Sequence, residues 1–167
     1  QFYGDDKLAF ENYAKAYPHR STLLVDTYNV LSSGVPAAIE VFKKMDKDAI
    51  KGIRLDSGDL KYLSQESRKL LDKAGLSDVM ITASNSLDEY KIRELEIQGA
   101  PLDSYGVGER MMTASSEPVY GGVYKLVAVE EDGEIDPRIK ISEDLVKVTN
   151  PGLKDVWRFF DNKTGKA

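Results

Sequence analysis

One plan, repeated along residues 20–110, constrains the fold more than any other feature of this 167-residue sequence. Short apolar, β-branched runs end in polar or glycine-rich residues, and an amphipathic helical pattern follows each of them. Strands are predicted at residues 22–25, 52–55 and 79–82, with a weaker one at 102–105. Successive βα units with crossover helices impose a parallel sheet. The sequence therefore predicts an α/β fold, built either as an open parallel sheet or as part of a barrel.

Helices are predicted between these strands from apolar spacing and from residues that suit helix ends. A helix over residues 36–45 has Pro36 in its first turn, where proline is favoured. The next helix ends before Gly75, which suits the position just after a helix. Ser86 with Glu89 three residues later has the spacing of a capping box, so a third helix is predicted to begin there.

The chain is predicted to divide near residue 115. Four βα units are about half of an eight-fold barrel, which typically needs roughly 250 residues. Residues 1–115 are therefore predicted to form part of an α/β barrel, and residues 116–167 a β-rich continuation of the same protein. That continuation has strand patterns at 123–129 and 156–160, with an irregular excursion over 130–155. The start without methionine and the abrupt end predict a piece of a larger protein.

Composition excludes several classes of function. The net charge of −5 lacks the basic excess typical of a nucleic-acid binder. There is no cysteine, which excludes disulfides and a catalytic thiol, and the single histidine, His19, excludes a histidine-rich metal centre. No apolar run approaches the roughly 20 residues that span a bilayer. We expect a cytoplasmic protein that binds neither membranes nor nucleic acid.

Candidate site residues gather where the predicted strands end, because ligands bind at the carboxyl ends of parallel strands. Asp26 and Asp56 each directly end an apolar strand, which favours function. For Ser57, Asp59 and Ser86, helix capping is the favoured interpretation. The candidate residues are Asp26, Thr27, Arg54, Asp56, Ser84, Asn85, Gly106, Val107, Gly108 and Glu109.

Arg54 is the most informative of these residues. It interrupts an apolar strand one step before the end, and a buried arginine needs an anionic or planar partner. Asp56 lies two residues on, on the same strand face, so the pair can form a bridge, bind a ligand together, or do both. The turn Gly106–Gly108 offers backbone N–H groups that suit a phosphate. His19 is predicted in a surface turn.

Several sequence blocks resemble nicotinate phosphoribosyltransferase and follow one another in the order of that family. The most specific is Arg-Leu-Asp-Ser-Gly-Asp at residues 54–59. The other blocks are at residues 24–28, 84–89, 105–110, 121–127, 137–142 and 147–152. The resemblance implies an irregular type II phosphoribosyltransferase barrel, dimeric in the whole enzyme. It also implies an NAD-salvage reaction in which nicotinate and 5-phosphoribosyl 1-diphosphate give nicotinate mononucleotide and diphosphate, with ATP and Mg²⁺ assisting.

The resemblance also implies roles for particular residues. Arg54 would contact nicotinate, and the catalytic pair Asp26 and Asp56 would face the ribose and the metal–diphosphate. The residues that would hold the 5-phosphate or line the substrate are Thr27, Ser84, Asn85, Gly106, Val107, Gly108 and Glu109. No metal ligand is assigned.

Two departures from the family pattern qualify the resemblance. The histidine that the family phosphorylates lies upstream of residue 1, and His19 is not in the matching context. Glu109 stands where the family often has threonine, and its carboxylate would repel a phosphate unless it points away. The alternatives are a related nicotinamide or quinolinate phosphoribosyltransferase, or a non-catalytic module derived from such a barrel. By itself, this chain is expected to be inactive.

Overall fold

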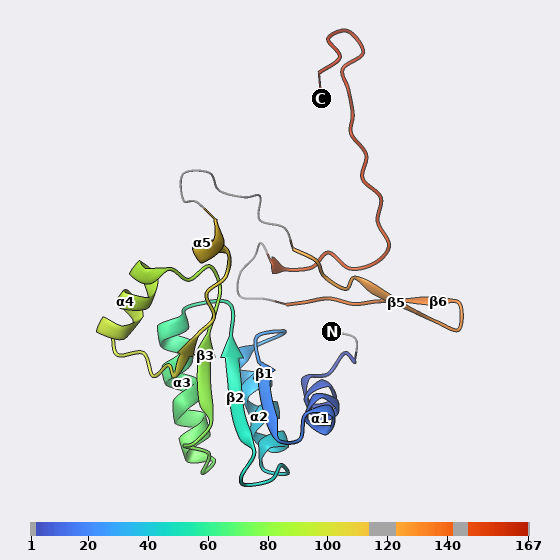
Figure 1. Ribbon diagram of the computed structural model, residues 1–167. Coiled ribbons are helices and arrows are strands. Elements are labelled where there is room, and N and C mark those ends of the chain that lie inside the picture. Colours follow the sequence, from blue (N-terminus) through green and yellow to red (C-terminus); the bar gives the residue numbers. More distant parts are fainter. Residues whose placement is uncertain (1–2, 114–122, 142–146, 167) are drawn as a thin grey trace.

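The protein is described by a computed structural model in which residues 3–113, 123–141 and 147–166 are placed. The helices and strands, in chain order, are α1 (Asp6–Ala16), β1 (Arg20–Leu24), the π-helical turn η1 (Val30–Gly34), α2 (Val35–Phe42), β2 (Ile50–Leu55), α3 (Leu60–Lys73), β3 (Met80–Ala83), α4 (Glu89–Ile97), β4 (Ser104–Tyr105), α5 (Glu109–Met112), β5 (Ala128–Glu131) and β6 (Glu134–Pro137). Strands β1 to β4 form one parallel sheet in sequence order (Figure 1). The predicted α/β class and parallel sheet are confirmed.

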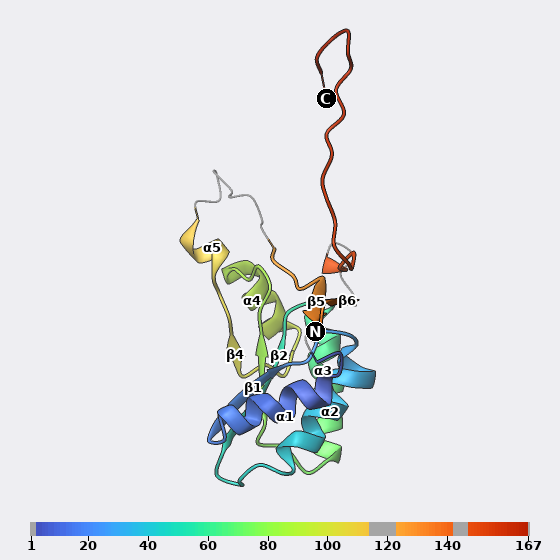
Figure 2. The same ribbon diagram turned by 90° about the vertical axis from the view of Figure 1, so that its right-hand side faces the viewer.

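The hydrophobic core lies between one face of this sheet and its helices. Helices α2 and α3 lie behind the sheet in Figure 1, and α1 packs beside α2 next to β1 (Figure 2). Alternate strand residues point into the core, which is why Leu23, Ile53 and Ile81 are almost fully buried there. Phe42 on α2 and Leu71 on α3 pack against them. The apolar periodicities of the sequence thus meet in a single core.

The opposite face of the sheet has a different character. In the part of the chain that the structure describes, no helix packs on it (Figure 1). Its residues lie in rows across the strands, because the parallel register places Leu24 beside Arg54, Arg54 beside Thr82, and Thr82 beside Ser104. Leu24 and Arg54 are exposed on this face. A parallel sheet is normally covered on both faces, so we expect further structure to cover this face in a longer protein.

The helix predicted over residues 36–45 begins and ends earlier in the structure. The chain first makes the π-helical turn η1, which Asn29 caps through its side chain, and α2 then ends at Phe42. Gly34 explains the irregular entry, since a Cβ at this position would lie 1.9 Å from the carbonyl oxygen of Val25. The turn therefore packs directly on the backbone that follows β1.

The capping box predicted at Ser86 is wrong. Ser86 and Asn85 both have left-handed backbone, with φ of 49° and 94°, so the chain is still turning at these residues. Helix α4 begins at Glu89, and Asp88 caps it by accepting a hydrogen bond from the N–H of Lys91 at 2.9 Å. Other predicted helix ends are confirmed, including the cap at Asp59 and the left-handed Gly75.

The C-terminal part differs from its prediction in three places. Only the end of the strand predicted at 123–129 is strand, and the excursion over 130–155 contains the second strand of an antiparallel ribbon, β5–β6. Residues 156–160 are extended but belong to no sheet. A tight turn follows, in which the N–H of Asp161 donates to the carbonyl of Lys166 and the N–H of Gly165 to that of Asp161.

Candidate functional site

The predicted site residues do gather at one edge of the parallel sheet. Backbone hydrogen bonds continue the ladder past the strand ends. The Val25 N–H donates to the Arg54 carbonyl at 3.2 Å, the Ser84 N–H to the Leu55 carbonyl at 2.9 Å, and the Gly106 N–H to the Ala83 carbonyl at 2.8 Å. The residues directly after these strands are therefore neighbours in space. This edge is the place where an α/β protein binds its ligand.

Arg54, Asp56 and Ser84 form a closed ring of polar contacts at this edge. The Arg54 Nε donates to the Ser84 hydroxyl at 2.8 Å, and the Arg54 Nη2 donates to Asp56 Oδ1 at 3.0 Å. The Ser84 hydroxyl in turn donates to the same Asp56 oxygen. The predicted bridge between Arg54 and Asp56 is confirmed. The prediction that Arg54 is buried is wrong, because its side chain is 49% exposed on the uncovered face.

Asp56 is held in its ionised form by its neighbours. Burial opposes ionisation, but the hydrogen bonds from Ser84 and Arg54 and the charge of Lys147 outweigh it and hold the pKa of the Asp56 carboxyl below its ordinary value. The Lys147 Nζ lies 3.6 Å from Asp56 Oδ2 and donates to the Asp56 backbone carbonyl at 2.7 Å. Asp56 is therefore a fixed negative charge within a ring of donors.

Asp26 lies deeper than Asp56. It is 2% exposed, and its Oδ2 accepts a hydrogen bond of 2.6 Å from the Ser57 hydroxyl. Ser57 therefore supports Asp26 and does not cap a helix, which corrects the capping interpretation for this residue. The Lys140 Nζ lies 3.7 Å from Asp26 Oδ1, an oxygen that has no hydrogen-bond partner in the structure. Thr27 follows Asp26 and is half-buried.

Lys140 and Lys147 are site residues that the sequence reasoning missed. Lys140 lies 114 residues beyond Asp26, and Lys147 lies 91 residues beyond Asp56, so no local periodicity brings these pairs together. The Thr149 N–H donates to the Lys140 carbonyl at 3.1 Å, which ties the two lysine segments side by side. Both lysines lie in blocks that carry the family resemblance, and this was the available signal.

The turns after β3 and β4 face each other closely. A Cβ on Gly106 would lie 3.3 Å from the Ser84 Cβ, so a residue without a side chain suits that position. Asn85 has a left-handed backbone that non-glycine residues rarely adopt, and such strain is concentrated at functional sites. Val107 is half-buried, Gly108 is exposed, and Glu109 opens the short helix α5 with its side chain exposed.

A cavity of about 370 Å³ opens beside these turns, between α3 and α4. Its lining residues are Gly58, Asp59, Leu60, Lys61, Asn85, Leu87, Lys91, Glu94, Leu95 and Gln98. Asp26, Asp56 and the Gly106–Gly108 turn are not among them, so this cavity does not join the two aspartates to that turn.

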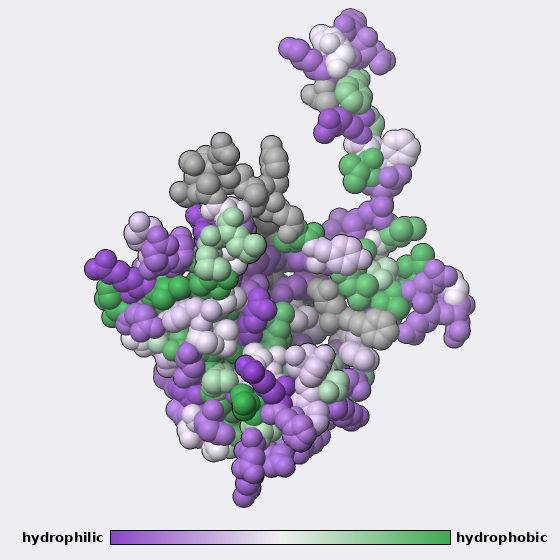
Figure 3. Space-filling model, viewed as in Figure 1, coloured by the Kyte–Doolittle hydropathy of each residue, from purple (hydrophilic) through white to green (hydrophobic). Residues whose placement is uncertain are grey.

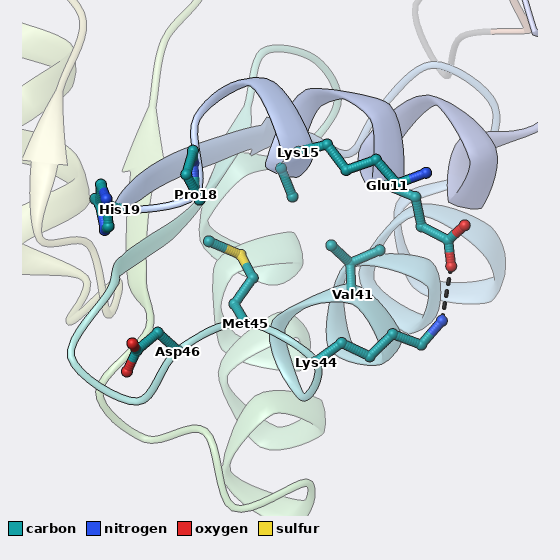
Figure 4. A pocket seen from close by; sticks show the side chains of 9 residues that line it. Glu11, Lys15, Pro18, His19, Val41, Lys44, Met45 and Asp46 are labelled. Carbon is teal, nitrogen blue, oxygen red and sulfur yellow. Dashed lines mark hydrogen bonds and ion pairs between the residues drawn. The ribbon is translucent and has the colours of Figure 1, made fainter.

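A larger cavity, of about 530 Å³, lies at the other end of the sheet. It runs between the C-terminal halves of α1 and α2, with Ala14, Val41 and Met45 among its lining residues (Figure 4). His19 borders it from the turn before β1 and is exposed, which confirms the predicted surface turn. This histidine therefore lies at the opposite end of the sheet from Asp26 and Asp56.

The described residues include no cluster that could hold a metal ion and no helix that could span a membrane. Among the described residues, no group of three or more histidine, cysteine, aspartate or glutamate side chains is placed to hold a metal ion. Over the same residues, no helix has the length and apolar character to cross a membrane.

Solved structures define the class of this fold. The nicotinate phosphoribosyltransferase of Porphyromonas gingivalis superposes with a TM-score of 0.62 over 89% of this chain and 40% of its own length, at 19% sequence identity. Human nicotinic acid phosphoribosyltransferase superposes with a TM-score of 0.53 at 35% identity, over 60% of this chain and 22% of its own. The chain therefore has the α/β fold of these phosphoribosyltransferases.

The sequence narrows the class further. Nicotinate phosphoribosyltransferase from Bacillus subtilis is 49% identical over 162 residues, which are 96% of this chain and 33% of the relative. The chain thus spans about one third of the length of that relative, and it is homologous to that segment of the nicotinate phosphoribosyltransferases. The resemblance seen in the motifs is confirmed. No protein-family model matches the chain.

Proposed function

We propose that this chain forms the substrate-binding part of a nicotinate phosphoribosyltransferase. In that reaction the ring nitrogen of nicotinate forms a bond to C1 of the ribose, and the bond between C1 and the diphosphate oxygen breaks. The observation that carries the proposal is the Arg54–Ser84–Asp56 ring at the carboxyl edge of the sheet. The names of the homologues support the same activity.

The uncovered face of the sheet supports the irregular barrel that is proposed for the whole protein. One row of its side chains is level across all four strands, as in an inward-facing layer of an α/β barrel. Thr82 and Ser104 share a hydrogen bond of 2.7 Å in this row. Further strands, supplied by the rest of a longer protein, would close this face into an interior with Arg54 near its mouth.

Arg54 suits the carboxylate of nicotinate. A guanidinium has five N–H donors, and the ring uses the one on Nε and one on Nη2. The donors left on Nη1 and Nη2 form a fork that matches the two oxygens of a carboxylate. The carboxamide of nicotinamide would place an N–H donor against the N–H donors of Arg54. We therefore propose that the site prefers nicotinate to nicotinamide.

The two lysines suit the diphosphate. The Lys140 and Lys147 ammonium groups stand at Asp26 and Asp56, where they offer positive charge to a leaving group that is strongly negative. Mg²⁺ is usually bound through one or two carboxylates together with substrate phosphates, and the half-buried carboxylate of Asp56 fits such a site. When bound, the ion would neutralise diphosphate charge. Asp26 Oδ1, which accepts no hydrogen bond from the described residues, is a second oxygen of the right kind.

The remaining candidate residues lie in the turns that follow the strands, and each has a proposed role toward the substrate. We propose that the 5-phosphate lies at the turn of Ser84 and Asn85 and at the Gly106–Gly108 turn. The N–H groups of Ser84 and Gly106 already donate to strand carbonyls, so those of Asn85, Val107 and Gly108 would meet the phosphate. Thr27 would border the substrate beside Asp26. Glu109 would then direct its exposed carboxylate away from the phosphate.

The whole enzyme is proposed to act as a dimer in NAD salvage, with ATP as a co-substrate. The phosphorylated histidine of that step would come from outside this chain, because His19 borders a cavity at the other end of the sheet. This chain alone is therefore expected to form no mononucleotide.

Replacing Arg54 in the whole enzyme tests the proposal. A charge-assisted contact is worth roughly 1.5–3 kcal/mol, so Arg54→Ala should lower kcat/KM for nicotinate about tenfold or more. Arg54→Lys should recover little, because an ammonium cannot form the fork. Arg93→Ala removes an exposed arginine on α4 and is the matched control. Unchanged nicotinate kinetics in Arg54→Ala would refute the assigned role.

A further inference from the structure

Ser84 differs from its neighbours in how completely its hydroxyl is used. The hydroxyl accepts the N–H of Arg54 Nε at 2.8 Å and donates to Asp56 Oδ1. Its oxygen also lies 3.3 Å from the carbonyl oxygen of Leu55, and the residue is 3% exposed. A hydroxyl has a single proton to donate, so Ser84 has little left to offer a ligand.

The backbone holds this serine in place. Its N–H donates to the Leu55 carbonyl at 2.9 Å, which fixes its distance from β2. Asn85 after it is left-handed, and Gly106 approaches it so closely that a Cβ there would lie 3.3 Å from the Ser84 Cβ. Neighbours on both sides therefore fix the position from which the hydroxyl meets Arg54 and Asp56.

Arg54 needs such a contact. Its side chain is half-exposed and has several rotatable bonds, so the Asp56 bridge alone would leave its plane free to turn. The second contact, at Nε, fixes the plane and directs the unused N–H groups away from the ring. One oxygen, Asp56 Oδ1, accepts hydrogen bonds from both Ser84 and Arg54, so the three side chains are coupled.

We infer that Ser84 is a positioning residue that locks Arg54 and Asp56 into one unit, so that recognition of the nicotinate carboxylate depends on a hydroxyl that does not itself touch the substrate. This inference rests on the proposed function. It assigns the Ser84 hydroxyl to the support of two other side chains, while the phosphate is left to the backbone of the turns.

The test is Ser84→Ala in the whole enzyme, with KM for nicotinate and KM for 5-phosphoribosyl 1-diphosphate as readouts. Loss of the plane-fixing contact at Arg54 should raise KM for nicotinate about three- to tenfold. KM for 5-phosphoribosyl 1-diphosphate should rise less, because its proposed contacts are the lysines and the turns rather than Arg54. A merely structural serine would change both KM values alike.

Two other variants complete the experiment. Ser84→Cys keeps the volume but weakens both hydrogen bonds, and it should fall between wild type and Ser84→Ala in both readouts. Ser64→Ala removes another fully buried serine hydroxyl, one that donates to the Lys61 carbonyl in α3, and should change neither readout.

The outcomes separate the two proposals. If the wild-type enzyme forms no nicotinate mononucleotide, the proposed function fails. If the wild type is active and the folded Ser84→Cys and Ser84→Ala enzymes keep its nicotinate KM, or change both KM values alike, the function stands and the role of Ser84 is refuted. If Ser84→Ala does not fold, Ser84→Cys alone decides between the two results.

Discussion

The sheet region, residues 6–113, and the C-terminal region, residues 123–166, contain apolar side chains in quite different situations. In the sheet region they meet in one core, with Phe42 only 1% exposed. In the C-terminal region Trp157 and Phe159 are 77% and 86% exposed, on an extended segment that projects from the body (Figure 3). Figure 1 shows the same segment leading away from the sheet. An apolar strand pattern becomes a strand only where a partner is within reach.

The largest expected effect is on stability. Phe42→Ala should lower the free energy of unfolding by about 3–5 kcal/mol, because it removes a fully buried aromatic ring. Phe159→Ala is the matched substitution in the C-terminal region and should change stability by less than about 0.5 kcal/mol. Urea unfolding followed by circular dichroism measures both. Equal losses would show that the C-terminal segment is packed and that the two regions do not differ.

A smaller effect concerns the contact between the two regions. Lys147→Ala removes the ammonium group at Asp56 and should cost at most about 1 kcal/mol at neutral pH. The pKa of Asp56 is lowered in the folded chain, so the stabilisation is present above the ordinary pKa of this carboxyl and is lost as the pH falls through the folded value. The part of the difference that depends on the Asp56 charge should therefore shrink as the pH falls below the ordinary aspartate pKa of about 3.9. The part that depends on the hydrogen bond from Lys147 to the Asp56 carbonyl should remain.

The control is Lys154→Ala. The Lys154 ammonium contacts only carbonyl groups of its own segment, those of Asn150 and Gly152, so its removal should leave stability unchanged at every pH. A loss of stability in Lys147→Ala that is the same at every pH would mean that the lysine acts through its hydrogen bond to the Asp56 carbonyl or through packing, and not through the charge of Asp56.

The smallest expected effect is on Trp157 fluorescence, whose emission maximum should not change when the protein unfolds. Trp157 is the sole tryptophan of the chain, so its fluorescence reports on the C-terminal region alone. Because it is already exposed, its emission maximum should match that of the denatured chain and stay constant while circular dichroism records the unfolding of the sheet region. An emission maximum that moves to longer wavelength with urea would reveal packing around Trp157.

The sheet region could be predicted well from sequence because its determinants are local. Short apolar runs that end before Asp26 and Asp56 indicated β1 and β2, and Asp59 indicated the start of α3. The start of α4 could not be predicted in this way, since Ser86 has the residue type of a cap but sits in a left-handed turn set by the packing after β3.

The candidate site was predictable only in part, for a related reason. Asp26, Arg54 and Asp56 stand at strand ends, and the rules of parallel sheets place them together. Lys140 and Lys147 reach the same edge through long-range charge pairing, which leaves no periodic trace in the sequence. The strand predicted at 156–160 did not form, because among the described residues no other strand pairs with this segment.

Gly34 has a consequence for how variation at this position should be interpreted. Its backbone angles are those of an ordinary helix, so the constraint comes from space alone: even the single methyl of alanine would overlap the Val25 carbonyl. That carbonyl lies one residue before Asp26. Natural selection would therefore keep glycine at position 34 as strictly as it keeps a residue that touches substrate, and invariance there would report the shape of the backbone under the site rather than chemistry.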